Sequence, residues 1–432
     1  MTNNHYEYKS IYTGIFGVNY FTQGVYTSIF SMVIPVYLLT KYGSVNSAAL
    51  AFMLSIILLP TAFKIIYGII SDSVSVNKLG RRKPWIIIPS IIGGLIWIIV
   101  SFIIPTTANA AISLFIITGI IISTCIYFSD TALDGFLLDI CPKSELGRTQ
   151  GFCWGLRAFG IIFGGPVILI FLVFIPIEFI FIGFGVIMLS FSLLSLLIKD
   201  IDTIMIPKIK TTFKDILKKK EHWKLFGFSF LLQIVGGVVY TFLALYILIR
   251  MGIVNPQGAR VTTYADVSIY EYQAFITLII SLGIIFGSIV AGIIADKKSR
   301  RLAIILGLLL YIFSLFLILL PVPIPILLII AFLIGTASAW YWAAYSALAG
   351  QYAKKYPDMI STFFALLVSI INIGTILGFI IIGVWFNTVS QITSDTLFIF
   401  GSLFAFMAIL EVLSIIPFLL LDRNYYEYKL AE

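Results

Sequence analysis

Long apolar runs that alternate with short polar turns make up almost the whole chain. Runs of about 20 apolar residues, enough for a helix to cross a bilayer, lie at 14–40, 47–71, 85–105, 109–140, 150–174, 177–198, 225–249, 270–295, 302–320, 324–351, 360–385 and 396–421. A helix satisfies its own backbone hydrogen bonds, which lipid cannot do. The pattern therefore predicts an all-α polytopic membrane protein with twelve transmembrane helices.

A short passage at the end of an apolar run occurs once in each half of the chain. Residues 68–72 (GIISD) lead into the basic loop 80–83 (GRRK), and residues 292–296 (GIIAD) lead into 297–301 (KKSRR). Such a repeat is typical of two-halved membrane bundles, which usually transport solutes. It predicts two pseudo-symmetric six-helix halves and a basic linker between them, at 1–198, 225–432 and 199–224 respectively.

Composition and charge agree with this interpretation. The chain is 60% hydrophobic and 11% charged, which leaves too little polar surface for a water-soluble domain. Of the 28 Lys and Arg residues, 23 fall in the loops on the side of the repeated passage, whereas Lys41, Arg250 and Arg260 fall on the other side. Positive loops stay in the cytoplasm, so we expect a multi-pass protein of the cell membrane with both termini cytoplasmic.

Several kinds of chemistry have no support in the sequence. There is no GxxxxGKS phosphate loop, no nucleophile elbow and no Cys/His cluster with metal-ligand spacing. The basic loops lack aromatic residues placed for stacking on bases, so nucleic acid is not an expected partner. We therefore expect neither an enzyme nor a cofactor or metal site.

Four ionisable residues lie deep inside the predicted spans two, four and five: Lys64, Asp130, Asp134 and Arg157. Charges at membrane depth are costly and usually face a cavity or a partner. Spans four and five form a hairpin centred near residue 144, which places Asp130 and Arg157 at nearly equal depth. Asp134 lies one helical turn from Asp130 on the same face. A polar cluster within the N-terminal half is the expectation.

The repeated passage resembles the signature loop of the major facilitator superfamily, with Ser73 in place of the usual basic residue after the acid. Three further patterns narrow the resemblance: PxxxK at 60–64, DxxxDG at 130–135 and GRxQG at 147–151. They look like the branch of muropeptide permeases, folate–biopterin transporters and acetyl-coenzyme A transporters. The resemblance implies the major facilitator fold and does not transfer a substrate.

The resemblance also implies a gate on the cytoplasmic side. Asp72 would face the start of span eleven near 358–361, and Asp296 the start of span five near 149–151, where the positive end of a helix favours an acid. The alternative is a set of solvated charges at a membrane edge. The gating candidates are Gly68, Asp72, Gly80, Arg81, Arg82, Gly292, Asp296, Arg300 and Arg301.

In this superfamily, spans one, four, seven and ten line a central cavity, with contributions from two, five, eight and eleven. The resemblance therefore implies substrate-binding roles for Tyr20, Gln23, Lys64, Arg157, Gln233, Tyr240, Trp342, Tyr345 and Asn372, and proton coupling through Asp130 and Asp134. Two alternatives stay open. Asp130 and Arg157 could form a static ion pair, and the aromatic and amide side chains could serve only helix packing.

These expectations favour a monomeric secondary active transporter that moves a small organic solute by alternating access within a lipid bilayer. An organic anion carried with a proton is the preferred cargo. One alternative is a facilitator or exchanger for sugars or other neutral solutes without proton coupling. Another is a transporter-shaped assembly or sensor protein.

Overall fold

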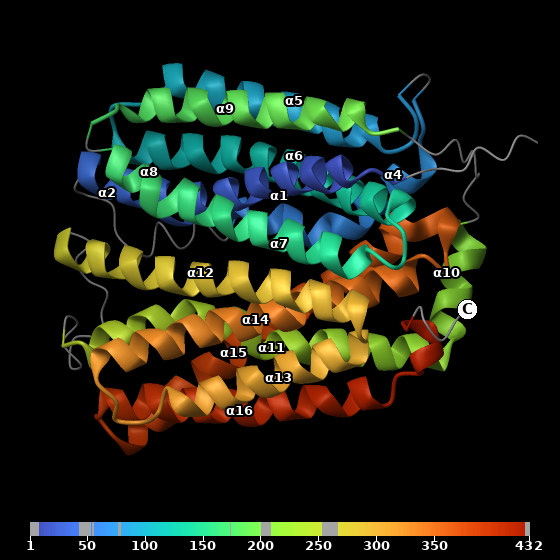
Figure 1. Ribbon diagram of the computed structural model, residues 1–432. Helices are drawn as coiled ribbons and strands as arrows, with labels where there is room; N and C mark the ends of the chain where they lie inside the picture. Colours follow the sequence, from blue (N-terminus) through green and yellow to red (C-terminus); the bar gives the residue numbers. More distant parts are fainter. Residues whose placement is uncertain are drawn as a thin grey trace, which may run out of the picture.

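Helices account for the regular structure of this chain. The computed structural model describes residues 8–42, 53, 56–76, 79–172, 174–199, 209–252 and 267–427. In this part of the chain every regular element is helical apart from one isolated bridge between Val76 and Gly80 (Figure 1). The predicted all-α class is confirmed.

The first six predicted spans correspond to helices that are partly interrupted. They are α1 (Ser10–Ser28) with η1 (Ile29–Val33) and α2 (Ile34–Tyr42); η2 (Leu59–Phe63) with α4 (Lys64–Ser73); α5 (Lys83–Phe102); α6 (Ala108–Ile140); α7 (Leu146–Ile162) with η3 (Phe163–Val167) and α8 (Ile168–Phe171); and α9 (Ile177–Leu193) with η4 (Leu194–Leu197). Most of the first part of the second predicted span, at 47–52 and 54–55, lies outside the described residues.

A short helix and six long helices follow. They are α10 (Ile209–Lys218), α11 (Lys220–Arg250), α12 (Val267–Lys297), α13 (Arg300–Leu317), α14 (Ile324–Ala353), η6 (Pro357–Met359) with α15 (Ile360–Ile392), and α16 (Thr396–Leu419) with η7 (Arg423–Tyr425). The seventh predicted span begins five residues earlier than expected, because α11 continues into the lysine-rich linker.

Many of these helices are long and apolar enough to span a membrane. Within the described ranges, nine helices are long and apolar enough to cross a bilayer: α5, α6, α7 through α8, α9, α12, α13, α14, α15 and α16. The multi-pass membrane character predicted from the sequence is therefore present in the structure.

Two of the spans contain a widened π turn beside a proline. η1 lies just before Pro35, and η3 contains Pro166. A proline ring has no N–H to donate and clashes with the carbonyl four residues back, so the backbone widens there instead of continuing as an α-helix. The uniform helices predicted at 14–40 and 150–174 miss these two interruptions.

The helices of the two halves meet along a defined seam. α7 packs against α12, and α4 packs against α15. In Figure 1 the blue and green helices of the first half form the upper part of the bundle and the yellow to red helices the lower part, with α7 and α12 next to each other. We use "seam" for these two contacts between the halves. The "motif end" is the end of the bundle that carries Asp72 and Asp296, at the right of Figure 1.

Candidate functional site

A cavity of about 310 Å³ lies between the two halves. Both halves contribute to its wall, the first mainly with charged and aromatic side chains and the second mainly with aromatic, amide and aliphatic ones. Its lining consists of Tyr20, Thr61, Lys64, Tyr127, Asp130, Asp134, Trp154, Arg157, Gln233, Trp342, Tyr345, Ser346, Ala349, Phe364, Leu367, Val368, Ile371 and Asn372. The structure thus brings Lys64, Asp130, Asp134 and Arg157 to the wall of one cavity, as the polar cluster predicted from the sequence requires.

Lys64 and Asp130 form a buried ion pair across the cavity wall. Lys64 is the first residue of α4, and its ammonium group also lies 5.5 Å from the centre of the Tyr127 ring. Asp130 lies in the middle of the long helix α6. The static pair considered from the sequence, Asp130 with Arg157, has the wrong cation, because the carboxylate of Asp130 is engaged by Lys64.

Asp134 lies one turn further along α6 and has a different kind of partner. The hydroxyl of Tyr20, on α1, donates a hydrogen bond to its carboxylate, and both side chains are buried. Among the described residues, no cation forms an ion pair with Asp134. The two acids of the cavity therefore differ, one paired with a cation and the other with a hydroxyl.

Arg157 presents a half-buried guanidinium group to the cavity from α7. Its Nη1 atom lies 3.5 Å from Oε1 of Gln23, and the group lies 5.0 Å from the centre of the Trp154 ring. Within the described part of the chain it forms no ion pair. Gln23 reaches the cavity only through this contact, since its own side chain lies beside a separate, very small hollow.

The second half closes the cavity with rings and amides. Trp342 on α14 lies against Trp154, with ring centres 5.3 Å apart, and Nε1 of Trp154 donates to Oγ of Ser346 at 3.1 Å across the seam. The Tyr345 hydroxyl is 2.7 Å from Oγ of Ser229, so this tyrosine already has a partner within its own half. Gln233 and Asn372 also line the wall. The Tyr240 side chain lies outside the described residues.

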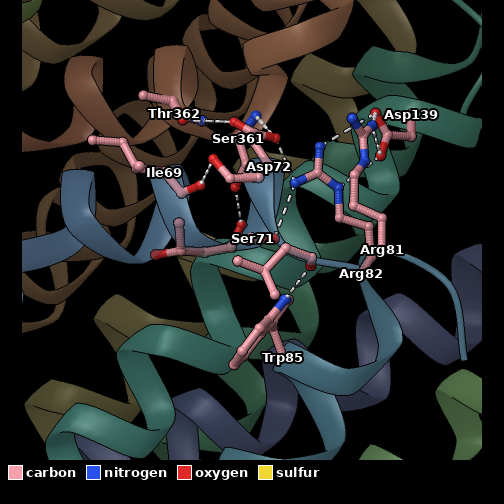
Figure 2. Close-up of polar contacts among 12 residues, drawn as sticks. Ile69, Ser71, Asp72, Arg81, Arg82, Trp85, Asp139, Ser361 and Thr362 are labelled. Carbon is pink, nitrogen blue, oxygen red and sulfur yellow. Dashed lines mark hydrogen bonds and ion pairs between the residues drawn. The ribbon is translucent and has the colours of Figure 1, made fainter. Parts of the chain in front are cut away.

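At the motif end, Asp72 joins α4 to the beginning of α15 (Figure 2). Its Oδ2 atom accepts hydrogen bonds from N of Thr362 at 2.7 Å and from Oγ1 of Thr362 at 2.6 Å, and N of Ser361 lies 3.4 Å from Oδ1. The predicted contact between Asp72 and the start of span eleven is present. Gly68 permits the approach, because a Cβ atom there would lie 2.8 Å from Cα of Thr362. We call Asp72, Ser361 and Thr362 the first latch.

A buried arginine ties the first latch to α6. Arg82 is fully buried and forms ion pairs with Asp72 at 2.6 Å and with Asp139 at 2.7 Å (Figure 2). Burial by itself lowers the pKa of Arg82, but the carboxylates of Asp139 and Asp72 outweigh burial and hold this pKa above its ordinary value. Arg81 adds a further ion pair with Asp139 at 3.1 Å.

Gly80 allows the tight turn that directly precedes Arg81 and Arg82. Its φ angle of +79° lies in the left-handed region that glycine adopts without strain. Its N–H group donates to O of Val76 at 3.1 Å, which closes a tight turn before Arg81 and Arg82.

Asp296 makes the corresponding contact on the other side of the seam. Its carboxylate accepts from N of Gly147 at 2.8 Å and from N of Arg148 at 2.6 Å, and Nε of Arg148 is 3.4 Å away. The predicted contact near 149–151 is therefore two residues too late, because α7 begins at Leu146 rather than at 150. A Cβ atom on Gly292 would lie 2.3 Å from O of Gly147. Asp296, Gly147 and Arg148 form the second latch.

The basic residues after the second motif do not repeat the arrangement of the first. Arg300 is buried and donates to two carbonyls, to O of Lys143 at 2.7 Å and to O of Tyr426 at 2.8 Å. The N–H groups of Arg300 and Arg301 point to the carboxylate of Glu427, at 3.3 and 2.8 Å. A segment near the C-terminus thus takes the place that Asp139 has in the first half.

Sequence reasoning missed several participants. Asp139 and Glu427 complete the charge networks at the motif end, and Tyr127, Trp154 and Ser346 line the cavity. One signal was available for Trp154, which lies three residues before Arg157 and so shares its helix face. The contacts of Asp139 and Glu427 join parts of the chain that no local spacing connects.

Membrane-spanning helices in two sets with a charged cavity between them are the arrangement of many secondary transporters. The sequence matches the family described as Major Facilitator Superfamily over residues 16–269 and 260–430, and the chain belongs to this family. The fold is accordingly the major facilitator fold, with twelve helices in two halves. Members of the family are transporters rather than enzymes.

Similar proteins agree at the level of the fold. A protein of Rickettsia conorii named as a transporter, AmpG 1, is 29% identical over 262 residues, which cover 57% of this chain and only 61% of the relative. The human organic anion transporter MFSD10 has a TM-score of 0.67 at 12% identity, over 95% of this chain and 98% of that one. The proton:xylose symporter XylE has a TM-score of 0.69 at 13% identity, over 96% and 97%.

Proposed function

We propose that this protein is a secondary active transporter that carries a small organic anion together with a proton. The observation that carries the proposal is the state of Arg157. Of the four charged groups in the cavity, Lys64 is paired with Asp130 and Asp134 is held by Tyr20. Among the described residues, Arg157 is held by Gln23 and the Trp154 ring and has no carboxylate partner. A guanidinium group that faces a cavity without a carboxylate suits a carboxylate or phosphate of a substrate.

The ion pair between Lys64 and Asp130, which lines the same cavity as Arg157, is the basis of the proposed proton coupling. Protonation of Asp130 would remove the negative charge that holds the Lys64 ammonium group, and Lys64 would then be available to the same anion as Arg157. Loss of the proton would restore the pair and weaken the hold on the substrate. Asp134, one turn away, is the second candidate for this proton.

The two latches supply the other half of the cycle. Both consist of an acid on one half that accepts N–H groups at the start of a helix on the other half, so they exist only while the motif end is shut. We propose that they bias the protein toward the state closed at this end, and that their release opens the cavity there.

The orientation belongs to the same proposal. Nearly all Lys and Arg residues outside the spans lie on the side of the motif end. By the positive-inside rule, this end and both termini face the cytoplasm. The proposal also places the protein in the cell membrane, as a monomer.

The first stage of the test identifies the cargo. Purified protein is screened by thermal shift against organic anions, sugars and nucleoside-like compounds, since a binder stabilises the folded state by mass action. We expect an anion among the binders, and we expect Arg157→Gln to weaken its affinity about tenfold or more, as loss of one charge-assisted contact does. Lys214→Gln, which removes an exposed charge on α10, is the matched control.

The second stage measures coupling. In proteoliposomes an inward proton gradient should accelerate uptake of the identified anion by the wild-type protein. Asp130→Asn should abolish this acceleration, whereas Asp215→Asn, at an exposed position of α10, should preserve it. Uptake by both Asp130→Asn and Asp134→Asn with undiminished dependence on the gradient contradicts proton coupling through these residues.

One observation favours a second candidate function. Trp154 and Trp342 line the cavity with their ring centres 5.3 Å apart, and Gln233 and Asn372 add neutral hydrogen-bonding groups to its wall. Such a wall suits a sugar or another flat neutral solute, with the charged residues in a structural role. A sugar among the binders, with an affinity that Arg157→Gln leaves unchanged, would favour this facilitator.

A further inference from the structure

A second hollow, of about 390 Å³, lies at the motif end, outside the seam. Its wall is formed by the turn between α12 and α13 and by the segment around η7, which contribute the cations Lys298, Arg301 and Arg423. Leu302 and Ile305, in the first turns of α13, form the apolar part of the wall. The lining of the hollow therefore has a basic part, which we call its rim, and an apolar part.

The one carboxylate of the hollow is already engaged. Glu427 accepts from Oγ of Ser299 at 2.6 Å and from the N–H groups of Arg300 and Arg301. Those bonds use the positive end of α13, so this helix start is not itself the attraction. Lys298 and Arg423 are exposed and form no ion pair within the described ranges. The rim thus carries three cations against one occupied acid, which favours an anion.

The surface next to the hollow decides what kind of anion fits. Above Leu302, the exposed apolar residues of α13 recur at alternating steps of four and three positions and so share one face: Leu306, Leu309, Phe313 and Phe316. This stripe runs along a helix of membrane-spanning length, and it begins at the hollow. An acyl chain can lie along it while a phosphate lies among the cations below.

We infer that this hollow binds the headgroup of an anionic phospholipid, whose acyl chain packs on the exposed stripe of α13. A free phosphate would use the cations but not the stripe. The headgroup would add a counter-charge to Lys298 and Arg423, and so hold the segment around η7 against the turn that follows α12. This site is separate from the transport cavity and does not depend on the cargo.

The test compares lipid classes on the purified full-length protein. We expect dioleoylphosphatidylglycerol to raise the Tm more than dioleoylphosphatidylcholine does, and more than inorganic phosphate or the deacylated headgroup glycerophosphoglycerol. In the double variant Lys298→Gln with Arg423→Gln, the apparent Kd for dioleoylphosphatidylglycerol should rise about 30-fold, since each basic residue near an anionic lipid contributes about a factor of five. Native mass spectrometry of retained lipid gives a second readout that does not depend on Tm.

The matched control is Lys214→Gln with Lys218→Gln, which removes the same charge from exposed positions at the same end. It should leave the apparent Kd within about twofold of the wild-type value. Equal weakening in both double variants would mean general electrostatic attraction and would overturn the site. Equal stabilisation by inorganic phosphate or glycerophosphoglycerol would show a free-anion site and would overturn the assignment to lipid.

Discussion

At the scale of single residues, burial and partner choice separate groups that look alike in the sequence. Asp72 and Asp296 occupy matching motif positions, yet Asp72 shares a fully buried arginine with Asp139, while Asp296 meets the half-exposed Arg148. Loss of one member of a buried charge pair is costly because the remaining charge stays buried. The ion pair of Asp72 in the first latch is therefore fully buried, whereas the Arg148 side chain of the second latch is half-exposed.

Lys354 provides the pH dependence that can be tested at this scale. It lies between α14 and η6 and donates from Nζ to O of Cys141 on the other side of the seam. Burial, with Arg300 and Lys143 nearby, lowers the pKa of Lys354 to about 8 from its ordinary value of 10.5. The unfolded chain then binds more protons than the folded protein between about pH 8 and pH 10.5, so Lys354 adds stability as the pH rises through this window.

The measurement compares Tm between pH 7.5 and 10 for the wild type and for Lys354→Gln, which keeps a donor for the Cys141 carbonyl but does not titrate. The difference in unfolding free energy between the two should change by about 2 kcal/mol across the window, in favour of the wild type at the higher pH. A difference that stays flat would show that the Lys354 ammonium group is as well solvated in the folded protein as in the unfolded chain.

At the scale of elements, the close packing of α7 against α12 depends on glycine residues, which have no side chain. A Cβ atom on Gly151 of α7 would lie 2.3 Å from O of Ser288 on α12, well inside van der Waals contact. Gly155, four residues on, faces the same helix, since a Cβ atom there would lie 3.2 Å from Oγ of Ser288. This GxxxG spacing is typical of closely packed membrane helices. Because the obstacle at Gly151 is backbone, an added methyl group must move a whole helix rather than one side chain.

Gly151→Ala should therefore destabilise the protein by about 2 kcal/mol, in the range of overpacked cores. The expected reading is a lower Tm in thermal unfolding of the detergent-solubilised protein. Gly183→Ala is the matched control, since nothing lies within 4 Å of the Cβ position there and alanine favours the helix. Equal Tm values for the two variants would mean that α7 and α12 can separate at little cost.

Elements were more predictable than their partners. Apolar run length fixes helix number and approximate bounds, because lipid permits few other structures. Depth in the membrane follows from a rise of about 1.5 Å per residue, but the facing direction follows from rotation about the helix axis. Matching depth alone left Arg157 open as a partner of Asp130, whereas the orientation of the helices in the structure pairs Asp130 with Lys64. The π turns near Pro35 and Pro166 follow from local chemistry that the run lengths conceal.

At the scale of the whole molecule, two buried cysteines of the first half can report whether the motif end opens. Cys141 is buried at the seam, where Lys354 donates to its carbonyl, and Cys125 is buried inside the first half against α5 and α9. If the latches hold the motif end shut, Cys141 becomes reachable when they open, while Cys125 stays covered in every state.

In single-cysteine variants, Asp72→Asn combined with Asp296→Asn should raise the rate of maleimide labelling of Cys141 about tenfold or more, since about 1.4 kcal/mol of latch energy corresponds to a factor of ten. The labelling rate of Cys125 should stay within about twofold of its wild-type value. A parallel rise at both cysteines would indicate general loosening of the protein instead of opening at one end.

The contact of Arg300 with Tyr426 has a consequence for biosynthesis. The guanidinium group enters the nascent chain more than a hundred positions before the carbonyl that receives one of its hydrogen bonds. Until the ribosome has added Tyr426 and Glu427, the Arg300 guanidinium group lacks one of its hydrogen-bond acceptors. The N–H groups of Arg300 and Arg301 likewise lack the carboxylate of Glu427. The surface of the second half at the motif end is thus completed only after α16 has been made.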